Sequence, residues 1–161
     1  FESEFKDILI SVQAINRNGV ILTIPTKDIS FNYRSCNLPK DLIFLSATFR
    51  GKKDNKENIK ELIKKLKMKK EKAQPTRIKT GGSTFKNPIK QTNKKVWEII
   101  KKSVPDNVQF GDAIISNKHC NFFVNKGNAS YEDMKRLIDY VKESVKKKTG
   151  INLDLEIILV E

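Results

Sequence analysis

The chain has 161 residues, a formal net charge of +13 at pH 7 and a hydrophobic content of 38%. This composition suits one ordinary domain, or one small domain and part of another, and no apolar run approaches the ~18 residues that span a membrane. Two cysteines and one histidine are too few for a disulfide framework, a histidine-rich metal centre or a charge-relay triad. The start at Phe1 has neither a basic end nor an apolar signal core, so we expect a cytoplasmic protein with an incomplete N-terminus.

Much of the positive charge is concentrated between residues 51 and 80, which contain twelve Lys or Arg and four Asp or Glu. The excess is almost all lysine, and this stretch contains no aromatic residue that could stack on a base. We interpret it as the solvated face of a helix, which is also compatible with attraction of a phosphorylated small molecule. A basic nucleic-acid-binding protein is the alternative that this segment leaves open.

The first third of the sequence predicts an antiparallel sheet. Residues 7–15 and 20–25 have the composition of strands, and Asn18-Gly19 between them is typical of a hairpin turn. Residues 42–50 predict a third strand. Residues 31–35 lie in the connection, where reactive side chains can be held on a loop.

A change of composition at Gly51 marks the start of a predicted helix. Asp54 and Glu57 have the spacing of a capping box, and Gln74-Pro75 marks the end of the helix. Between these points the apolar residues recur at helical spacing. They are Ile59, Leu62, Ile63 and Leu66.

The remaining residues predict a compact unit of type βαββα. An amphipathic helix is expected near 92–103, and short strands at 113–116 and 121–125. Ser130 with Asp133 opens a second helix, which Gly150 is placed to end. The last segment, 151–161, alternates and then becomes wholly apolar, so we expect a buried strand that carries Glu156. The fold class is therefore α+β.

The most informative segment is the octapeptide from Gly81 to Pro88. Its two glycines allow the backbone to approach a ligand closely, and a hydroxyl, an ammonium and an amide follow within the same segment. Such a loop can present a proton donor, a cation and a hydrogen-bonding amide to one anionic substrate. On pattern alone, however, a turn with capping hydroxyls is the favoured interpretation. Pattern alone also makes Arg34 a surface cation, and it leaves open whether Glu156 is buried or faces outward.

Four passages in this order carry a family resemblance. They are Tyr33-Arg34-Ser35, Gln74-Pro75 with Gly82–Pro88, the run from Phe110 to Ala129, and Ile151–Glu156. Together they resemble the C-terminal half of the UDP-N-acetylenolpyruvoylglucosamine reductases, MurB, which are flavoenzymes of peptidoglycan precursor synthesis. The match extends over essentially the whole chain.

The resemblance implies a domain organisation. Residues 1–51 would be the end of the antiparallel sheet of an FAD-binding domain, 52–75 a linker helix, and 76–161 the substrate-binding domain with its terminal glutamate-bearing strand. The glycine-rich turns that hold the FAD diphosphate in this family are not in the sequence, so the residues that bind the cofactor are unknown. A separate N-terminal FAD-binding chain is one way to complete the enzyme.

The resemblance also implies a function. The chain would take part in the FAD-mediated, NADPH-dependent reduction of UDP-N-acetylglucosamine enolpyruvate, a step in cell-wall biosynthesis, with no metal, membrane or nucleic acid involved. By this resemblance Arg34 would pair with the substrate carboxylate, Glu156 would donate a hydrogen bond to it, and Ser83 would supply the proton. Tyr33, Lys86 and Asn87 would bind substrate. The alternative is an inactive split or truncated substrate-binding module of the same fold.

Overall fold

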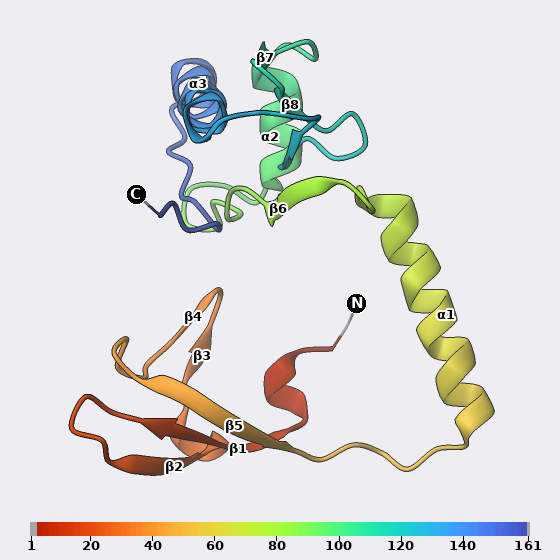
Figure 1. Cartoon of the computed structure of the whole chain (residues 1–161), viewed down its shortest axis with the longest axis vertical. Helices are drawn as coiled ribbons and strands as arrows, with labels where there is room; N and C mark the ends of the chain where they lie inside the picture. Colours follow the sequence, from red (N-terminus) through yellow and green to blue (C-terminus); the bar gives the residue numbers. More distant parts are fainter. Residues whose placement is uncertain (1–2, 161) are drawn as a thin grey trace. The chain divides into compact units, whose positions relative to one another are not determined.

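The computed structural model describes residues 3–160 (Figure 1). The chain divides into two compact units, residues 1–63 and residues 64–161, with the boundary inside helix α1 (Lys56–Ala73). Each unit has its own sheet and its own hydrophobic cluster. Helices and antiparallel sheets occur together, as the predicted α+β class requires.

The sheet of the first unit has three strands. β1 (Leu9–Ile15) lies between β2 (Ile21–Pro25) and β5 (Ile43–Phe49), and both neighbours are antiparallel to it. This confirms the three predicted strands and the hairpin. The turn of the hairpin is stabilised by Asn16, whose Oδ1 accepts hydrogen bonds from two main-chain N–H groups of the loop.

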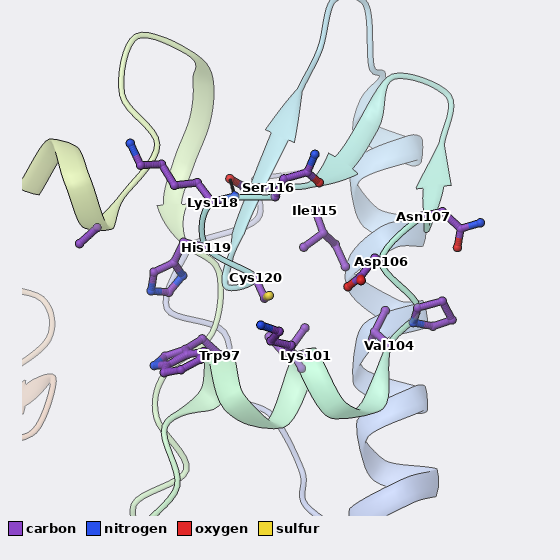
Figure 2. A pocket seen from close by; sticks show the side chains of 14 residues that line it. Trp97, Lys101, Val104, Asp106, Asn107, Ile115, Ser116, Lys118, His119 and Cys120 are labelled. Carbon is purple, nitrogen blue, oxygen red and sulfur yellow. Dashed lines mark hydrogen bonds between the residues drawn. The ribbon is translucent and has the colours of Figure 1, made fainter.

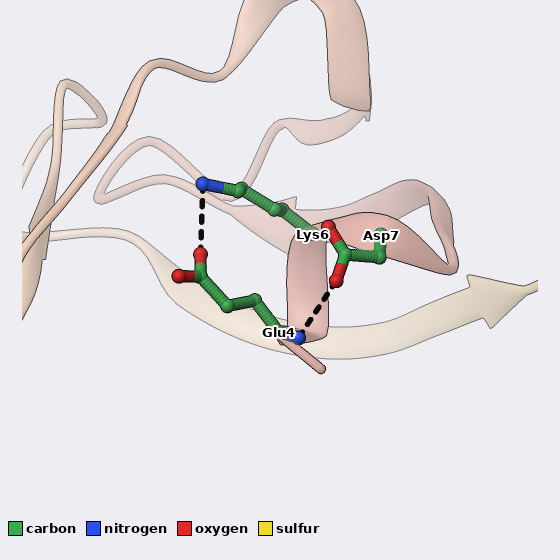
Figure 3. Close-up of polar contacts among 3 residues, drawn as sticks. All are labelled: Glu4, Lys6 and Asp7. Carbon is green, nitrogen blue, oxygen red and sulfur yellow. Dashed lines mark hydrogen bonds and ion pairs between the residues drawn. The ribbon is translucent and has the colours of Figure 1, made fainter. Parts of the chain in front are cut away.

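Two short 3-10 helices flank β1 and β2. η1 (Phe5–Asp7) begins at Glu4, whose N–H donates to the Asp7 carboxylate at 2.7 Å and whose carboxylate forms an ion pair with Lys6 (Figure 3). η2 (Thr26–Asp28) follows β2, and the Thr26 hydroxyl donates to the Leu9 carbonyl at 2.6 Å. The core of this unit is small: Leu9, Val12 and Ile29 are buried, whereas every residue of β5 is exposed.

The predicted connection at 31–35 contains regular structure. β3 (Phe31–Asn32) pairs with β4 (Ser35–Cys36) as a short antiparallel hairpin, and Tyr33-Arg34 forms its two-residue turn. The sequence expectation of a loop was therefore incomplete, because two residues on each side are too few to show a strand periodicity.

Helix α1 begins one residue later than its capping signal predicts. Asn55, not Asp54, is the capping residue, because its Oδ1 accepts the N–H of Asn58 at 2.8 Å. The helix ends at Ala73, just before Gln74-Pro75, as predicted. All its side chains are exposed, including the apolar residues that recur at helical spacing.

The second unit combines a four-stranded antiparallel sheet of order β6-β9-β8-β7 with two helices. Helices α2 and α3 contact each other, and α3 also contacts β7 and β8. The two helices and strands β8 and β9 were predicted, although α2 begins at Val96 and not near residue 92. Strands β6 and β7 were missed. The elements are β6 (Lys79–Ser83), α2 (Val96–Ser103), β7 (Gln109–Phe110), β8 (Ala113–Ile115), β9 (Phe122–Asn125) and α3 (Tyr131–Thr149).

The core of the second unit lies where α2, α3 and the sheet meet. Its largest fully buried side chains are Phe85, Ile100, Leu137, Ile138, Val141 and Val145. Helix α3 begins with the predicted capping box, in which Ser130 Oγ accepts the Asp133 N–H and the Asp133 carboxylate accepts the Ser130 N–H. Its C-cap is Gly150, also as predicted.

The prediction of a terminal buried strand was wrong. Within residues 151–160 only Leu155 makes a β-bridge, with Phe85. Ile158 and Val160 are 87% and 80% exposed. The ladder ends on one side because the partner segment turns away at Asn87-Pro88, and on the other side because the C-terminal segment itself bends at Glu156-Ile157.

Candidate functional site

The octapeptide begins as a strand and then leaves the sheet. β6 ends at Ser83, which pairs with Phe122 of β9, and the register of the ladder shifts between Thr80 and Ser83. Gly82, with φ of 89°, adopts the left-handed backbone that this shift requires and that other residues adopt only under strain. Ser83 is half-buried at the point where the chain leaves β9. The octapeptide was expected to be a loop throughout, and this expectation was wrong for its first three residues.

The C-terminal segment runs antiparallel beside this loop. The Glu156 N–H donates to the Thr84 carbonyl at 2.8 Å, and the Lys86 N–H donates to the Asp154 carbonyl at 2.9 Å. Glu156 is half-buried. The structure thus brings Ser83 and Glu156, which are far apart in the sequence, onto neighbouring extended segments of one unit.

Asn87 has a structural contact that the sequence did not reveal. Its Oδ1 accepts the Val96 N–H at 2.9 Å, at the first residue of α2. This bond satisfies a main-chain donor at the start of the helix and orients the side-chain amide of Asn87. Lys86 is half-buried next to it.

Tyr33 and Arg34 lie together in the first unit, in the turn between β3 and β4. Arg34 has φ of 57°, a left-handed backbone for a residue with a Cβ, and its guanidinium lies 5.1 Å from the centre of the Tyr33 ring. A strained residue of this kind is held by its surroundings and is more frequent at functional sites. Of the six residues expected to form the site, these two belong to the first unit and four to the second.

A pocket of about 800 Å³ lies in the second unit, between α2, β8, the loop before β9 and the end of α1 (Figure 2). The sequence analysis missed it because its walls come from separate stretches of the chain. The lining residues are Ala73, Trp97, Ile100, Lys101, Val104–Asn107 and Ile115–Cys120. In Figure 2 Trp97 and His119 lie at one end of the pocket and Asp106 and Asn107 at the other.

The polar lining of the pocket combines charges of both signs with two rings. Lys101 and Lys118 supply positive charge and Asp106 negative charge, and the rings of Trp97 and His119 make an edge contact, with 6.5 Å between their centres. Lys118 Nζ also donates to the main-chain carbonyl of Glu71 in the last turn of α1. Together these groups form a site of the size and mixed character that small ligands occupy.

His119 connects the pocket with the segment before β9. Its Nδ1 accepts the Asn121 N–H at 3.2 Å, and its carbonyl accepts the Phe122 N–H at 2.9 Å. These two bonds give His119 a structural role in the loop before β9. Burial lowers the pKa of the His119 imidazole from its ordinary value of 6.5, so at pH 7 the ring is neutral and its proton is on Nε2.

Within residues 3–160 the structure also bears on cysteine reactivity, metal binding and membrane-spanning helices. Burial raises the pKa of the Cys120 thiol, which keeps it protonated and weakly nucleophilic. In this part of the chain, no three His, Cys, Asp or Glu residues are grouped to hold a metal ion. None of the helices described here has the length and apolar character needed to cross a membrane.

Comparison with known proteins points to one family. Residues 74–160 match the family model described as UDP-N-acetylenolpyruvoylglucosamine reductase, C-terminal domain. The UDP-N-acetylenolpyruvoylglucosamine reductase of Pelagibacter ubique is 64% identical over 98% of this chain, and that of Rickettsia conorii is 41% identical over the same share. The chain spans about half, 52%, of the length of each. The crystal structure of this reductase (MurB) from Thermus caldophilus superposes with a TM-score of 0.75 at 28% identity, covering 94% of this chain and 52% of that one.

Proposed function

Because the chain belongs to the UDP-N-acetylenolpyruvoylglucosamine reductase family, we propose that it is the substrate-binding half of an FAD- and NADPH-dependent oxidoreductase of peptidoglycan biosynthesis. The observation that carries the proposal is the antiparallel pairing that places Glu156 beside the serine loop. The chain spans about half the length of its relatives, so the activity belongs to an enzyme that also contains a flavin-binding part.

The described residues of the first unit do not by themselves fit FAD. The cavity of this unit has a volume of about 350 Å³, and its walls are apolar apart from Ser46 and Cys36. It contains no cation to meet a diphosphate, and no glycine-rich turn lies beside it. We therefore assign the redox chemistry to the part of the enzyme outside this chain, and to these residues only the binding and protonation of substrate.

The chemistry of the substrate explains why these side chains are needed. Adding hydride to an enolpyruvyl group moves negative charge onto its carboxylate, as an enediolate, and a proton must reach the neighbouring carbon. The Arg34 guanidinium is suited to pair with that carboxylate through two parallel hydrogen bonds. By the family resemblance, a protonated Glu156 would donate a third.

Ser83 is the residue to which we assign the proton. A free serine hydroxyl is a very weak acid, so donation requires a strongly basic acceptor and stabilisation of the alkoxide that remains. The enediolate provides the first condition, and we assign the second to the half-buried ammonium of Lys86, three residues after Ser83 in the sequence.

We assign the remainder of a UDP-sugar to the pocket of the second unit, which none of the six residues expected from the sequence lines. In this proposal Lys101 and Lys118 neutralise the diphosphate, the His119 Nε2–H donates to it, and the Trp97 ring contacts the flat base. The cavity volume of about 800 Å³ lies in the range that drug-sized ligands occupy. Asn87 and Tyr33 complete the proposed set of substrate-binding residues.

The decisive experiment separates the two half-reactions in the flavin-loaded enzyme that contains this chain. We expect Ser83→Ala to leave flavin reduction by NADPH unchanged and to slow flavin reoxidation by the enolpyruvyl substrate by at least about 100-fold. Ser83→Cys, which keeps a proton donor, should retain more of the reoxidation rate than Ser83→Ala. Equal loss of both half-reactions would show that Ser83 shapes the site without donating a proton.

The carboxyl role has its own test in the same assay. Glu156→Gln keeps a hydrogen-bond donor and should slow reoxidation less than Glu156→Ala. The reverse order would contradict a protonated carboxyl at this position.

A second candidate is a binding module without turnover, which the cavity of the first unit favours because its lining holds no cation for a diphosphate. Calorimetry on the 161-residue chain tests the binding of the UDP-sugar, which both functions require. Flavin reoxidation in the enzyme that contains this chain distinguishes them, because a chain that binds the UDP-sugar but supports no reoxidation is a binding module. If Lys118→Ala leaves substrate affinity unchanged, the pocket is not the binding site.

A further inference from the structure

Asn121 is a buried polar residue that the proposed chemistry does not use. It precedes β9 and is 3% exposed. Its Oδ1 accepts the Phe85 N–H at 2.9 Å, and its Nδ2 donates to the Phe85 carbonyl at 2.8 Å. Its main-chain carbonyl accepts the Thr84 N–H at 2.8 Å. One residue therefore binds three main-chain groups in the two residues that follow Ser83.

These bonds replace a missing stretch of β-ladder. Ser83 pairs with Phe122 at the end of the β6–β9 ladder, after the register has shifted. In the bridge to Leu155, the hydrogen bonds come from the residues on either side of Phe85, so the N–H and carbonyl of Phe85 itself point away from the C-terminal segment. The Asn121 side chain satisfies both groups, and a buried main-chain group left unpaired is costly.

We propose that Asn121 is a positioning residue, which fixes the Ser83 hydroxyl and, through the Phe85–Leu155 bridge, the Glu156 carboxyl in the geometry that the reaction needs. This inference rests on the function proposed above. Asn121 holds the chain immediately after Ser83, and the bridge that it supports is immediately before Glu156. A displacement of about 1 Å in a reacting group can cost on the order of 100-fold in rate.

Asn121 also joins this loop to the pocket, because its N–H donates to His119 Nδ1 at 3.2 Å. The segments that contact Asn121 carry several charged or titratable side chains, namely those of His119, Cys120, Lys86, Asp154 and Glu156. A pH-dependent test must therefore use the native chain at each pH as its reference.

The first measurement is amide hydrogen exchange in the 161-residue chain. In Asn121→Leu the Phe85 N–H loses its acceptor, and its protection should fall by about tenfold or more. The Thr84 N–H is the internal control, because it donates to the main-chain carbonyl of residue 121, which the substitution keeps. Unchanged protection at Phe85 would overturn the proposal.

Asn121→Asp makes the test reversible. The introduced carboxylate can accept the Phe85 N–H but has no donor for the Phe85 carbonyl, whereas the protonated carboxyl has both groups. Near neutral pH the buried carboxylate therefore faces the Phe85 carbonyl oxygen with no proton between them, and this repulsion should open the loop and lower the protection of the Phe85 N–H. Burial raises the pKa of such a carboxyl, so the protection should return as the pH falls. If Asn121→Leu does not fold, this recovery decides the question, and its absence overturns the proposal.

The second measurement is flavin reoxidation by the enolpyruvyl substrate in the enzyme that contains this chain. We expect Asn121→Asp to slow it about 10- to 100-fold near neutral pH, to recover toward the native rate at acid pH, and to leave flavin reduction by NADPH unchanged. Asn125→Asp is the matched control. Asn125, the last residue of β9, makes the same kind of pair, because its Oδ1 accepts the Ala129 N–H and its Nδ2 donates to the Ala129 carbonyl. It lies at the other end of the β6–β9 ladder from Ser83, so this variant should show neither the slowing of reoxidation nor its acid recovery.

The outcomes distinguish this inference from the proposed function. If the native enzyme does not reduce the enolpyruvyl substrate, the proposed function fails and the positioning role fails with it. If the native enzyme is active and the reoxidation rate of Asn121→Asp relative to it does not change with pH, the positioning role alone is refuted.

Discussion

Removing one hydroxyl from helix α2 should stabilise the second unit. Ser103 is the last residue of α2 and is 2% exposed, and among residues 3–160 its Oγ has no hydrogen-bond partner. A buried polar group left unpaired costs about 1–3 kcal/mol. Alanine removes that cost and has a slightly better helix propensity, while the small gap left by the oxygen loses a few contacts of about 0.1–0.2 kcal/mol each. We expect Ser103→Ala to raise the free energy of unfolding by about 1–2 kcal/mol.

The assay is urea unfolding followed by the fluorescence of Trp97, the single tryptophan, which lies on the same helix. In a unit of this size a gain of 1 kcal/mol corresponds to a rise in Tm of about 4–8 °C. Ser130→Ala is the matched control, because the Ser130 hydroxyl caps α3 and its loss should cost about 1 kcal/mol. A serine-to-alanine substitution is thus expected to raise the free energy of unfolding at residue 103 and to lower it at residue 130. A lower midpoint for Ser103→Ala would show that the hydroxyl is paired in solution and would refute the reasoning.

Three further predictions concern the backbone and pH. Arg34→Val should destabilise the β3–β4 hairpin by about 1–3 kcal/mol because a β-branched residue tolerates the left-handed backbone poorly, whereas Arg34→Asn should not, as amide exchange in the first unit would show. Gly111→Ala should destabilise the second unit by about 2 kcal/mol or more, because φ is 51° and an added Cβ would lie 2.5 Å from Asp133 Oδ2. In the Asp133→Ala background the same glycine substitution should cost less free energy of unfolding, which a double-mutant cycle would measure. Burial lowers the pKa of the His119 imidazole in the folded chain, so near pH 6 the unfolded chain binds more protons than the folded chain does. The contribution of His119 to the free energy of unfolding is therefore present above the ordinary pKa of 6.5 and is lost as the pH falls through the folded pKa. His119→Gln should flatten this dependence in urea unfolding between about pH 7.5 and pH 5.

The sequence alone was sufficient where the signal is local and repeated. The capping pair Ser130 and Asp133 predicted the start of α3, and Gly150 predicted its end. Alternation with a turn signal at Asn18-Gly19 predicted the first hairpin. The four ordered motifs predicted the family, which the match of residues 74–160 confirms. In each case the pattern depends on residues close to one another in the sequence, so it can be recognised without the structure.

The tertiary structure decided whatever depends on pairing between distant segments. An apolar run at 151–160 resembles a strand, but it pairs with one residue only, because Asn87-Pro88 turns the partner away on one side of the bridge and the chain bends at Glu156-Ile157 on the other. The two hydrogen bonds of Asn121 to Phe85 span 36 positions, and no periodicity encodes them. The pocket could not be predicted from the sequence, because its walls come from distant segments, namely α1, α2 and the loop before β9. Local spacing determines which elements form, whereas the satisfaction of buried main-chain groups across the fold determines where the reactive side chains lie.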